Sequence, residues 1–201
     1  MIRSVISDLG KVLITFDNSI FYRKIAVYSP IPVEEIPEIV NVYSDVGRAI
    51  DTGMLSPQGF YERVKEILQV ELSFEEFAAI YNDVFASNTP VIKVMGKLKN
   101  KYRLVMLSNT DLLRFGFIRE KFPEVMIFDD YVLSYQVGCV KPDPRIYQLA
   151  LQKAQAGPKE CVFIDDRPEN IAAAEDLGIR TILFLDDTDL EAELNSFGLS
   201  F

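Results

Sequence analysis

Residues 103–122 read RLVMLSNTDLLRFGFIREKF, and this stretch decides the fold class. Its first six residues are an apolar run of the length expected for a buried strand, which ends at Ser108, Asn109 and Thr110. Residues 112–122 then carry apolar side chains at helical spacing. A strand followed at once by a helix is the unit from which parallel sheets are built.

The same alternation continues on both sides of this unit. Further strands are predicted at residues 2–7, 130–134, 161–165 and 180–185. Helices are predicted between and after them, at residues 143–156, 168–177 and 188–197. Strands separated by helices of this length predict a parallel sheet covered on both faces, which is an α/β, Rossmann-like fold.

Residues 17–88 have a different pattern, because they are amphipathic helical segments punctuated by prolines. Ser56 precedes Pro57, and Ser73 precedes Glu76 by three residues, so both serines are predicted helix N-caps. The aromatic side chains of this segment recur at helical spacing, which favours a role in a core. Because the first strand belongs to the sheet, residues 1–16 and 89–201 are predicted to form the core domain and residues 17–88 an inserted helical cap domain.

Composition excludes several classes of function. The chain has 21 Lys and Arg against 30 Asp and Glu, a net charge of -9, which argues against nucleic acid as a partner. It has no histidine, so Ser-His-Asp chemistry and histidine-based zinc sites are excluded. No run approaches the roughly 18 apolar residues that cross a bilayer, so no membrane partner is predicted. Cys139 and Cys161 form no metal or disulfide pattern, which predicts a cytoplasmic location.

Polar residues stand where the predicted strands end. Asp8 follows the first strand, Ser108 ends the strand of residues 103–108, and Asp165 and Asp166 end another. Ligands of open parallel sheets bind beyond the carboxyl ends of the strands, so these side chains are expected to converge. Each residue taken alone is better explained as a turn or helix-capping residue. Together, three converging carboxylates require a cation, and Mg²⁺ with oxygen ligands meets that need.

Four ordered motifs resemble those of the haloacid dehalogenase (HAD) superfamily. They are ISDLGKVL at residues 6–13, LVMLSNT at 104–110, GCVKPDPRIY at 138–147 and VFIDDRPENIAAAEDLGI at 162–179. The long insertion after the first motif also matches the helical cap of this superfamily. The Asp-Leu-Gly form of the first motif is similar to the subgroup that includes bacterial phosphatases of sugar phosphates such as glucose 1-phosphate.

The resemblance implies that Asp8 attacks phosphorus and forms an aspartyl-phosphate. Ser108 and Lys141 would hold the oxygens of the transferring phosphoryl group, Asn109 would add a hydrogen bond to it, and Lys141 would also restrain Asp8.

The resemblance also implies a magnesium cofactor, held by Asp8, by Asp166 directly, by Asp165 directly or through water, and by the backbone carbonyl at position 10. This chain departs from the family there, because Gly10 replaces the aspartate that normally acts as general acid and base. Asp17, nine residues after Asp8, is a candidate replacement. An equally good interpretation makes Asp17 a linker or helix-capping residue.

Three functions are therefore open. The first is a magnesium-dependent phosphatase of a small phosphorylated metabolite, a sugar phosphate being one candidate. The second is a 2-haloacid dehalogenase, although those relatives need no metal and carry an aromatic residue in place of Gly10. The third is a non-catalytic protein that binds a phosphorylated ligand and has lost turnover at Gly10.

Overall fold

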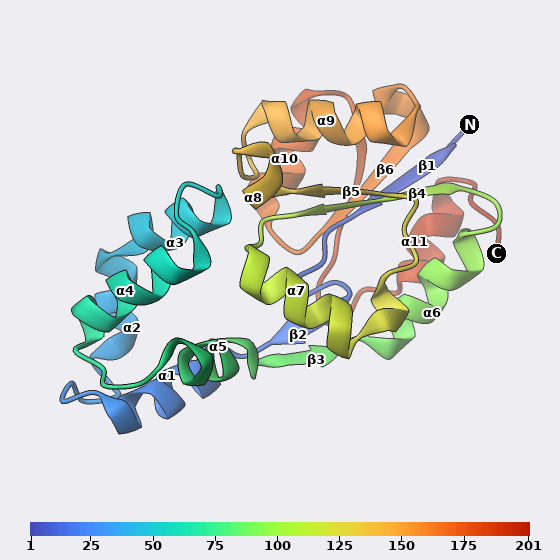
Figure 1. The fold of residues 1–201 in the computed structure, drawn as a ribbon. Coiled ribbons are helices and arrows are strands. Elements are labelled where there is room, and N and C mark those ends of the chain that lie inside the picture. The colour runs from blue at the N-terminus through green and yellow to red at the C-terminus, as the bar shows by residue number, and fades with distance from the viewer.

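The computed structural model describes all residues, 1–201, and its centre is a parallel five-stranded sheet (Figure 1). The strand order is β5-β4-β1-β6-β7. The strands are β1 (Ser4–Ser7), β4 (Arg103–Ser108), β5 (Asp130–Leu133), β6 (Cys161–Asp165) and β7 (Arg180–Leu183). The predicted α/β sheet is confirmed. Two of the five strands, β4 and β6, have the predicted bounds, and the other three are shorter than predicted by one or two residues.

Helices cover both faces of this sheet, as the alternation predicts. One face carries α6 (Thr89–Leu98), α7 (Leu112–Lys121) and α11 (Leu190–Ser196), which share a single cluster of buried apolar side chains with the sheet. The other face carries α9 (Pro144–Ala154) and α10 (Pro168–Asp176) around a second cluster. The sequence analysis missed α6 and the short helix α8 (Ser134–Val137).

The segment between the first two sheet strands is helical. It contains α1 (Asn18–Ile25), a 3₁₀ turn (Ala26–Tyr28), α2 (Ile36–Val42), α3 (Ser44–Asp51), α4 (Pro57–Leu68) and α5 (Phe74–Asn82). Ser56 and Ser73 are N-caps as predicted, and Ser73 forms a capping box with Glu76. These helices share their own apolar cluster, in which Phe77 is fully buried. None of the helices of this protein is both long enough and apolar enough to cross a membrane.

Two short strands join the helical segment to the sheet. β2 (Ile14–Phe16) pairs antiparallel with β3 (Phe85–Ser87), so the chain leaves and returns side by side. In Figure 1 the helices α1–α5 lie together at one end of the sheet, beyond this two-stranded connection. The sequence predicts the two crossings near these positions but not their pairing. That residues 17–88 form a separate cap domain stays a prediction.

The helical segment also touches the core at a second place, the turn after α3. Gly53 has a φ of +71°, and a Cβ atom there would lie 2.3 Å from the backbone oxygen of Tyr135 in α8. Such an approach requires glycine, because the neighbouring atom is backbone and cannot rotate away.

We therefore expect Gly53→Ala to separate the α3 turn from α8 and to lower the free energy of unfolding by roughly 1–3 kcal/mol, through a strained backbone and the clash. Thermal or denaturant unfolding checks this. Gly96→Ala is the matched control, because a Cβ at this exposed position of α6 meets nothing within 4 Å; it should stabilise the protein by up to about 1 kcal/mol. Equal changes in the free energy of unfolding for Gly53→Ala and Gly96→Ala would contradict the close contact between the α3 turn and α8.

Candidate active site

The carboxyl ends of two adjacent strands bring three carboxyl groups together. Asp8 directly follows β1, Asp165 is the last residue of β6, and Asp166 comes next. The parallel register aligns Ser7 with Ile164, so the two strand ends lie side by side. Carboxylate oxygens of Asp8, Asp165 and Asp166 all lie within 4.8 Å of one another. The structure thus assembles the acidic cluster that the strand pattern predicts.

Lys141 is the cation at the centre of this cluster. It is buried, and its Nζ lies 2.7 Å from Oδ1 of Asp8 and 2.7 Å from Oδ2 of Asp165. The same ammonium donates a hydrogen bond of 3.1 Å to the backbone oxygen of Leu107 in β4. With three oxygen acceptors, its three N–H groups are fixed in direction, and Lys141 holds the Asp8 carboxylate in place.

The charges of this cluster do not balance. Three carboxyl groups face one ammonium group, and burial raises the pKa of Asp8 to about 7, with the charge of Asp165 adding to the effect and that of Lys141 opposing it. Burial, with the charge of Asp165, also raises the pKa of Asp166. Two negative charges remain when all carboxyl groups are ionised. A divalent cation that prefers carboxylate oxygens, as Mg²⁺ does, fits this donor set and would keep Asp8 ionised.

The two adjacent aspartates have different surroundings. Asp165 is fully buried, and its Oδ1 accepts hydrogen bonds from the backbone N–H of Arg167 and from Nδ2 of Asn170, each at 2.9 Å. Its Oδ2 accepts the bond from Lys141. Asp166 is only half-buried. The geometry therefore makes Asp165 the residue that anchors Lys141 and leaves Asp166 the freer carboxylate for a metal ion.

Ser108 and Asn109 lie beside Lys141 at the end of β4. The Ser108 hydroxyl is buried, and its one protein contact is a weak 3.5 Å bond to the backbone oxygen of Asn109, so it remains available to a ligand. The Asn109 amide is engaged: Nδ2 donates to the backbone oxygen of Lys141 at 3.0 Å, and Oδ1 accepts from its N–H at 2.8 Å. Asn109 thus positions Lys141, and its predicted hydrogen bond to phosphate stays a prediction.

Gly10 lies beside the aromatic ring of Phe16. A Cβ at this position would lie 3.2 Å from Cε1 of Phe16. Lys11, which has a φ of +60°, turns its ammonium to the backbone oxygen of Phe16 at 2.8 Å and lies 4.6 Å from the centre of the Phe16 ring. A Cβ at position 10 would therefore require the Phe16 ring to move by a few tenths of an ångström.

Asp17 acts as the N-cap of α1. Its Oδ1 accepts a hydrogen bond of 2.9 Å from the backbone N–H of Ser19, and the side chain is exposed. The hydrogen bond from Ser19 lowers the pKa of Asp17. The capping interpretation of Asp17 is confirmed. A carboxyl group with a lowered pKa is a poor proton donor, which counts against its alternative role as general acid.

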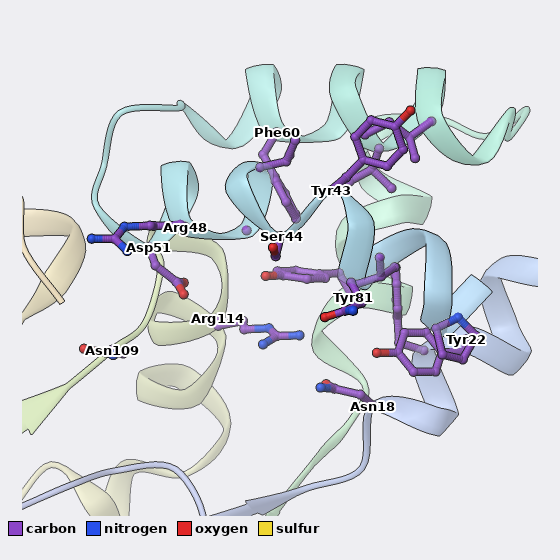
Figure 2. A pocket seen from close by; sticks show the side chains of 18 of the residues that line it. Asn18, Tyr22, Tyr43, Ser44, Arg48, Asp51, Phe60, Tyr81, Asn109 and Arg114 are labelled. Carbon is purple, nitrogen blue, oxygen red and sulfur yellow. The ribbon is translucent and has the colours of Figure 1, made fainter. Parts of the chain in front are cut away.

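A pocket of about 710 Å³ extends from this site to the helical segment (Figure 2). Lys141 and Asn109 line it from the core. Helices α1 to α5 supply most of the rest, including Asn18, Asp51 and Tyr81, and Arg114 projects into it from α7. The sequence analysis did not single out Asn18, Asp51 or Arg114, because no motif marks them and only the packing of distant helices brings them together.

Comparison with known proteins agrees with this arrangement. The family model described as haloacid dehalogenase-like hydrolase matches residues 30–178. The D-ribitol-5-phosphate phosphatase of Bacteroides thetaiotaomicron is 25% identical over 96% of this chain and 97% of that protein. The sesquiterpene phosphatase of Aspergillus oryzae is 26% identical over 88% of this chain and 87% of its own length.

Solved structures match over nearly the full length. A HAD family enzyme from Bacteroides thetaiotaomicron, in complex with magnesium and inorganic phosphate, superposes with a TM-score of 0.86 at 26% identity, over 96% of this chain and 99% of that one. An L-2-haloacid dehalogenase superposes with a TM-score of 0.68 at 17% identity, over 95% of this chain and 90% of that one, which shows a shared fold only. With its α/β sheet, its acidic cluster and a family match over most of its length, this chain belongs to the haloacid dehalogenase-like hydrolases.

Proposed function

We propose that the protein is a magnesium-dependent phosphatase of a small phosphorylated metabolite, and that it works through an aspartyl-phosphate on Asp8. The observation that carries this proposal is the Asp8 carboxylate, held 2.7 Å from the buried Lys141 ammonium and within 4.8 Å of oxygens of Asp165 and Asp166. This is a positioned nucleophile in a site whose remaining charge calls for a divalent cation.

In the proposed reaction, the ionised Asp8 oxygen forms a bond to phosphorus while the bond from phosphorus to the ester oxygen breaks. The Ser108 hydroxyl donates a hydrogen bond to the phosphoryl oxygens, where negative charge is concentrated, and the nearby Lys141 ammonium offsets that charge. The ester oxygen leaves with the electron pair and takes up a proton from water. A water molecule then attacks phosphorus and gives up a proton as the bond between phosphorus and the Asp8 oxygen breaks, which releases inorganic phosphate and regenerates the carboxylate. Magnesium would be held by Asp8, Asp166, the Gly10 carbonyl and, directly or through water, Asp165, and it would supply positive charge that offsets the charge of the phosphoryl group.

The relatives support this choice over the alternatives. Two relatives are phosphatases by name, and the matching HAD family enzyme was solved with magnesium and inorganic phosphate. A 2-haloacid dehalogenase, which needs no metal, would leave the charge of Asp166 in the acidic cluster without a cation, because Lys141 is already paired with Asp8 and Asp165. A non-catalytic protein would need no ionised nucleophile held by a buried lysine. The two cysteines are free and buried, which supports the cytoplasmic location we propose.

Magnesium should bind the native protein, activate it and raise its melting temperature. Ligand binding to the native state stabilises by about 2.7 kcal/mol at a hundred times the Kd, which corresponds to roughly 5–11 °C in a chain of this size. Asp166→Ala should reduce both the melting shift and the activity. The measurements are thermal melts and hydrolysis of p-nitrophenyl phosphate, each with magnesium and with a chelator.

Asp176→Ala is the matched control, because Asp176 is exposed at the end of α10. It should retain the magnesium response of the native protein. Full activity of the native enzyme in the presence of chelator would reject the metal-dependent chemistry.

Gly10 stands where the family has its general acid, so we expect the rate of the chemical step to depend strongly on the basicity of the leaving oxygen. A positioned general acid contributes a rate factor of about 10² to 10⁴, and its loss matters most when the departing oxygen is strongly basic. We expect aryl phosphates to react faster than simple alkyl phosphates under single-turnover conditions. Asp17→Asn should leave this dependence unchanged, because the Asp17 side chain caps α1. A chemical step that is insensitive to leaving-group basicity in native enzyme, and becomes sensitive in Asp17→Asn, would make Asp17 the acid.

A further inference from the structure

A cluster of polar side chains in the pocket has no part in the proposed phosphoryl chemistry. Its fixed point is Asp111, the fully buried N-cap of α7, whose Oδ1 accepts from the backbone N–H of Arg114 and whose Oδ2 accepts from the Tyr81 hydroxyl, each at 2.9 Å. The Arg114 guanidinium lies 4.2 Å from the centre of the Tyr81 ring, and its Nε is 4.0 Å from Oδ2 of Asp111. These contacts hold Arg114 in one orientation.

Two polar atoms of the pocket lining are buried and have no hydrogen-bond partner in the protein. One is Nε of Arg114, a donor, and the other is Oδ1 of Asn18, an acceptor. Figure 2 shows Arg114 extending from α7 toward the side of the pocket where Asn18 stands, with the Asp51 carboxyl group projecting into the same space from α3. A buried polar group without a partner is costly, so such groups in a binding pocket indicate the chemistry of the ligand.

We propose that Asn18, Asp51 and Arg114 bind hydroxyl groups of the leaving alcohol, so that the substrate is a polyhydroxylated monophosphate such as a sugar or polyol phosphate. This inference rests on the proposed phosphatase function. A hydroxyl group both donates and accepts, and it therefore pairs with the guanidinium of Arg114 and with the oxygens of Asn18 and Asp51. An alkyl chain pairs with none of these groups. A second phosphate or a carboxylate accepts only, and leaves the acceptors unpaired.

The pocket lining carries charges of both signs. Asp51 lies among Arg48, Arg114, Lys141 and Arg167, and the buried Asp111 acts on the same region. Burial raises the pKa of Asp51 to about 6, with the charge of Asp111 adding and that of Arg114 opposing. The alternative to a polyhydroxylated substrate is one with an apolar leaving group, because 11 of the 22 residues that line the pocket are hydrophobic.

The test compares phosphate esters that share the reacting group. We expect native enzyme to hydrolyse glucitol 6-phosphate with a kcat/KM about 10- to 100-fold above that of hexyl phosphate, which corresponds to one or two hydrogen bonds to charged groups. In Asp51→Asn and in Arg114→Gln this ratio should fall about 10-fold or more.

Each variant has a matched control on its own helix. Asp45→Asn on α3 and Arg119→Gln on α7 change exposed residues outside the pocket lining, and they should keep the native ratio. Asp51→Asn should remain folded, since a carboxyl group with a raised pKa destabilises the ionised protein and its neutral replacement does not. This inference would be overturned if native enzyme hydrolysed p-nitrophenyl phosphate with magnesium but showed a glucitol 6-phosphate to hexyl phosphate ratio of kcat/KM near or below one. It would also be overturned if that ratio were unchanged in both Asp51→Asn and Arg114→Gln. Loss of that hydrolysis in native enzyme would instead overturn the proposed function.

Discussion

Asp8→Asn is expected to lower kcat for p-nitrophenyl phosphate by at least about 10⁴-fold, because it removes the nucleophile on which the covalent step depends. The amide that replaces the carboxylate has the same shape but does not attack phosphorus. The fold should persist, since Asp8 lies at a strand end and its replacement takes one negative charge out of a buried cluster that already contains an excess. Steady-state kinetics and a thermal melt check both parts.

Asp129→Asn is the control for this variant, since Asp129 precedes β5 and pairs with Lys99 away from the acidic cluster. It should keep the native kcat, with at most a modest loss of stability from the broken ion pair. Hydrolysis by Asp8→Asn at a rate near that of the native enzyme would reject Asp8 as the nucleophile, whatever the metal dependence.

Lys141→Met is expected to damage both activity and stability. It leaves Asp8 and Asp165 buried with no positive partner, and breaking a buried ion pair from one side costs about 3–5 kcal/mol. It also removes a positive charge from beside the phosphoryl group, for which we expect kcat to fall about 10²- to 10³-fold. Denaturant unfolding and steady-state kinetics measure the two losses, and Lys101→Met, at an exposed turn, is the control.

The loss of stability in Lys141→Met should depend on pH in a defined direction. Burial lowers the pKa of Lys141, but the charges and hydrogen bonds of Asp8 and Asp165 outweigh it and raise the pKa above the ordinary value of 10.5. The native stabilisation is therefore complete below that value and is lost only as the pH rises through the folded-state pKa. In the variant, Asp8 loses the Lys141 charge that opposes the rise of its pKa, so the deficit should shrink as the pH falls and Asp8 becomes protonated. A deficit of constant size between pH 8 and pH 5 would contradict this ion-pair explanation.

The sheet and its acidic edge could be predicted from the sequence because both follow from local patterns. Apolar runs alternate with amphipathic helices, and that order permits one parallel arrangement in which Asp8 and the Asp165–Asp166 pair meet. Lys141 follows from its motif. The resemblance also implies the contact of Lys141 with Asp8, but its second ion pair, with Asp165, could not be predicted, because it depends on the path of the loop after α8.

The rest of the pocket depends on tertiary packing that leaves no periodic signal. Asp51 and Arg114 are 63 positions apart and meet only because α3 and α7 line the same pocket. The Phe16 ring beside Gly10 results from the pairing of two three-residue strands, which are too short to stand out in a sequence. Asn109 looks like a ligand residue at a strand end, and its engagement with the backbone of Lys141 is a long-range contact.

The most direct test of the central claim is mass spectrometry of the enzyme quenched in acid during turnover of a phosphate ester with magnesium. The proposed chemistry predicts one added phosphoryl group on the peptide that contains Asp8, and none in the presence of chelator or in Asp8→Asn. A phosphoryl group on a different residue, or the same modification in Asp8→Asn, would contradict it.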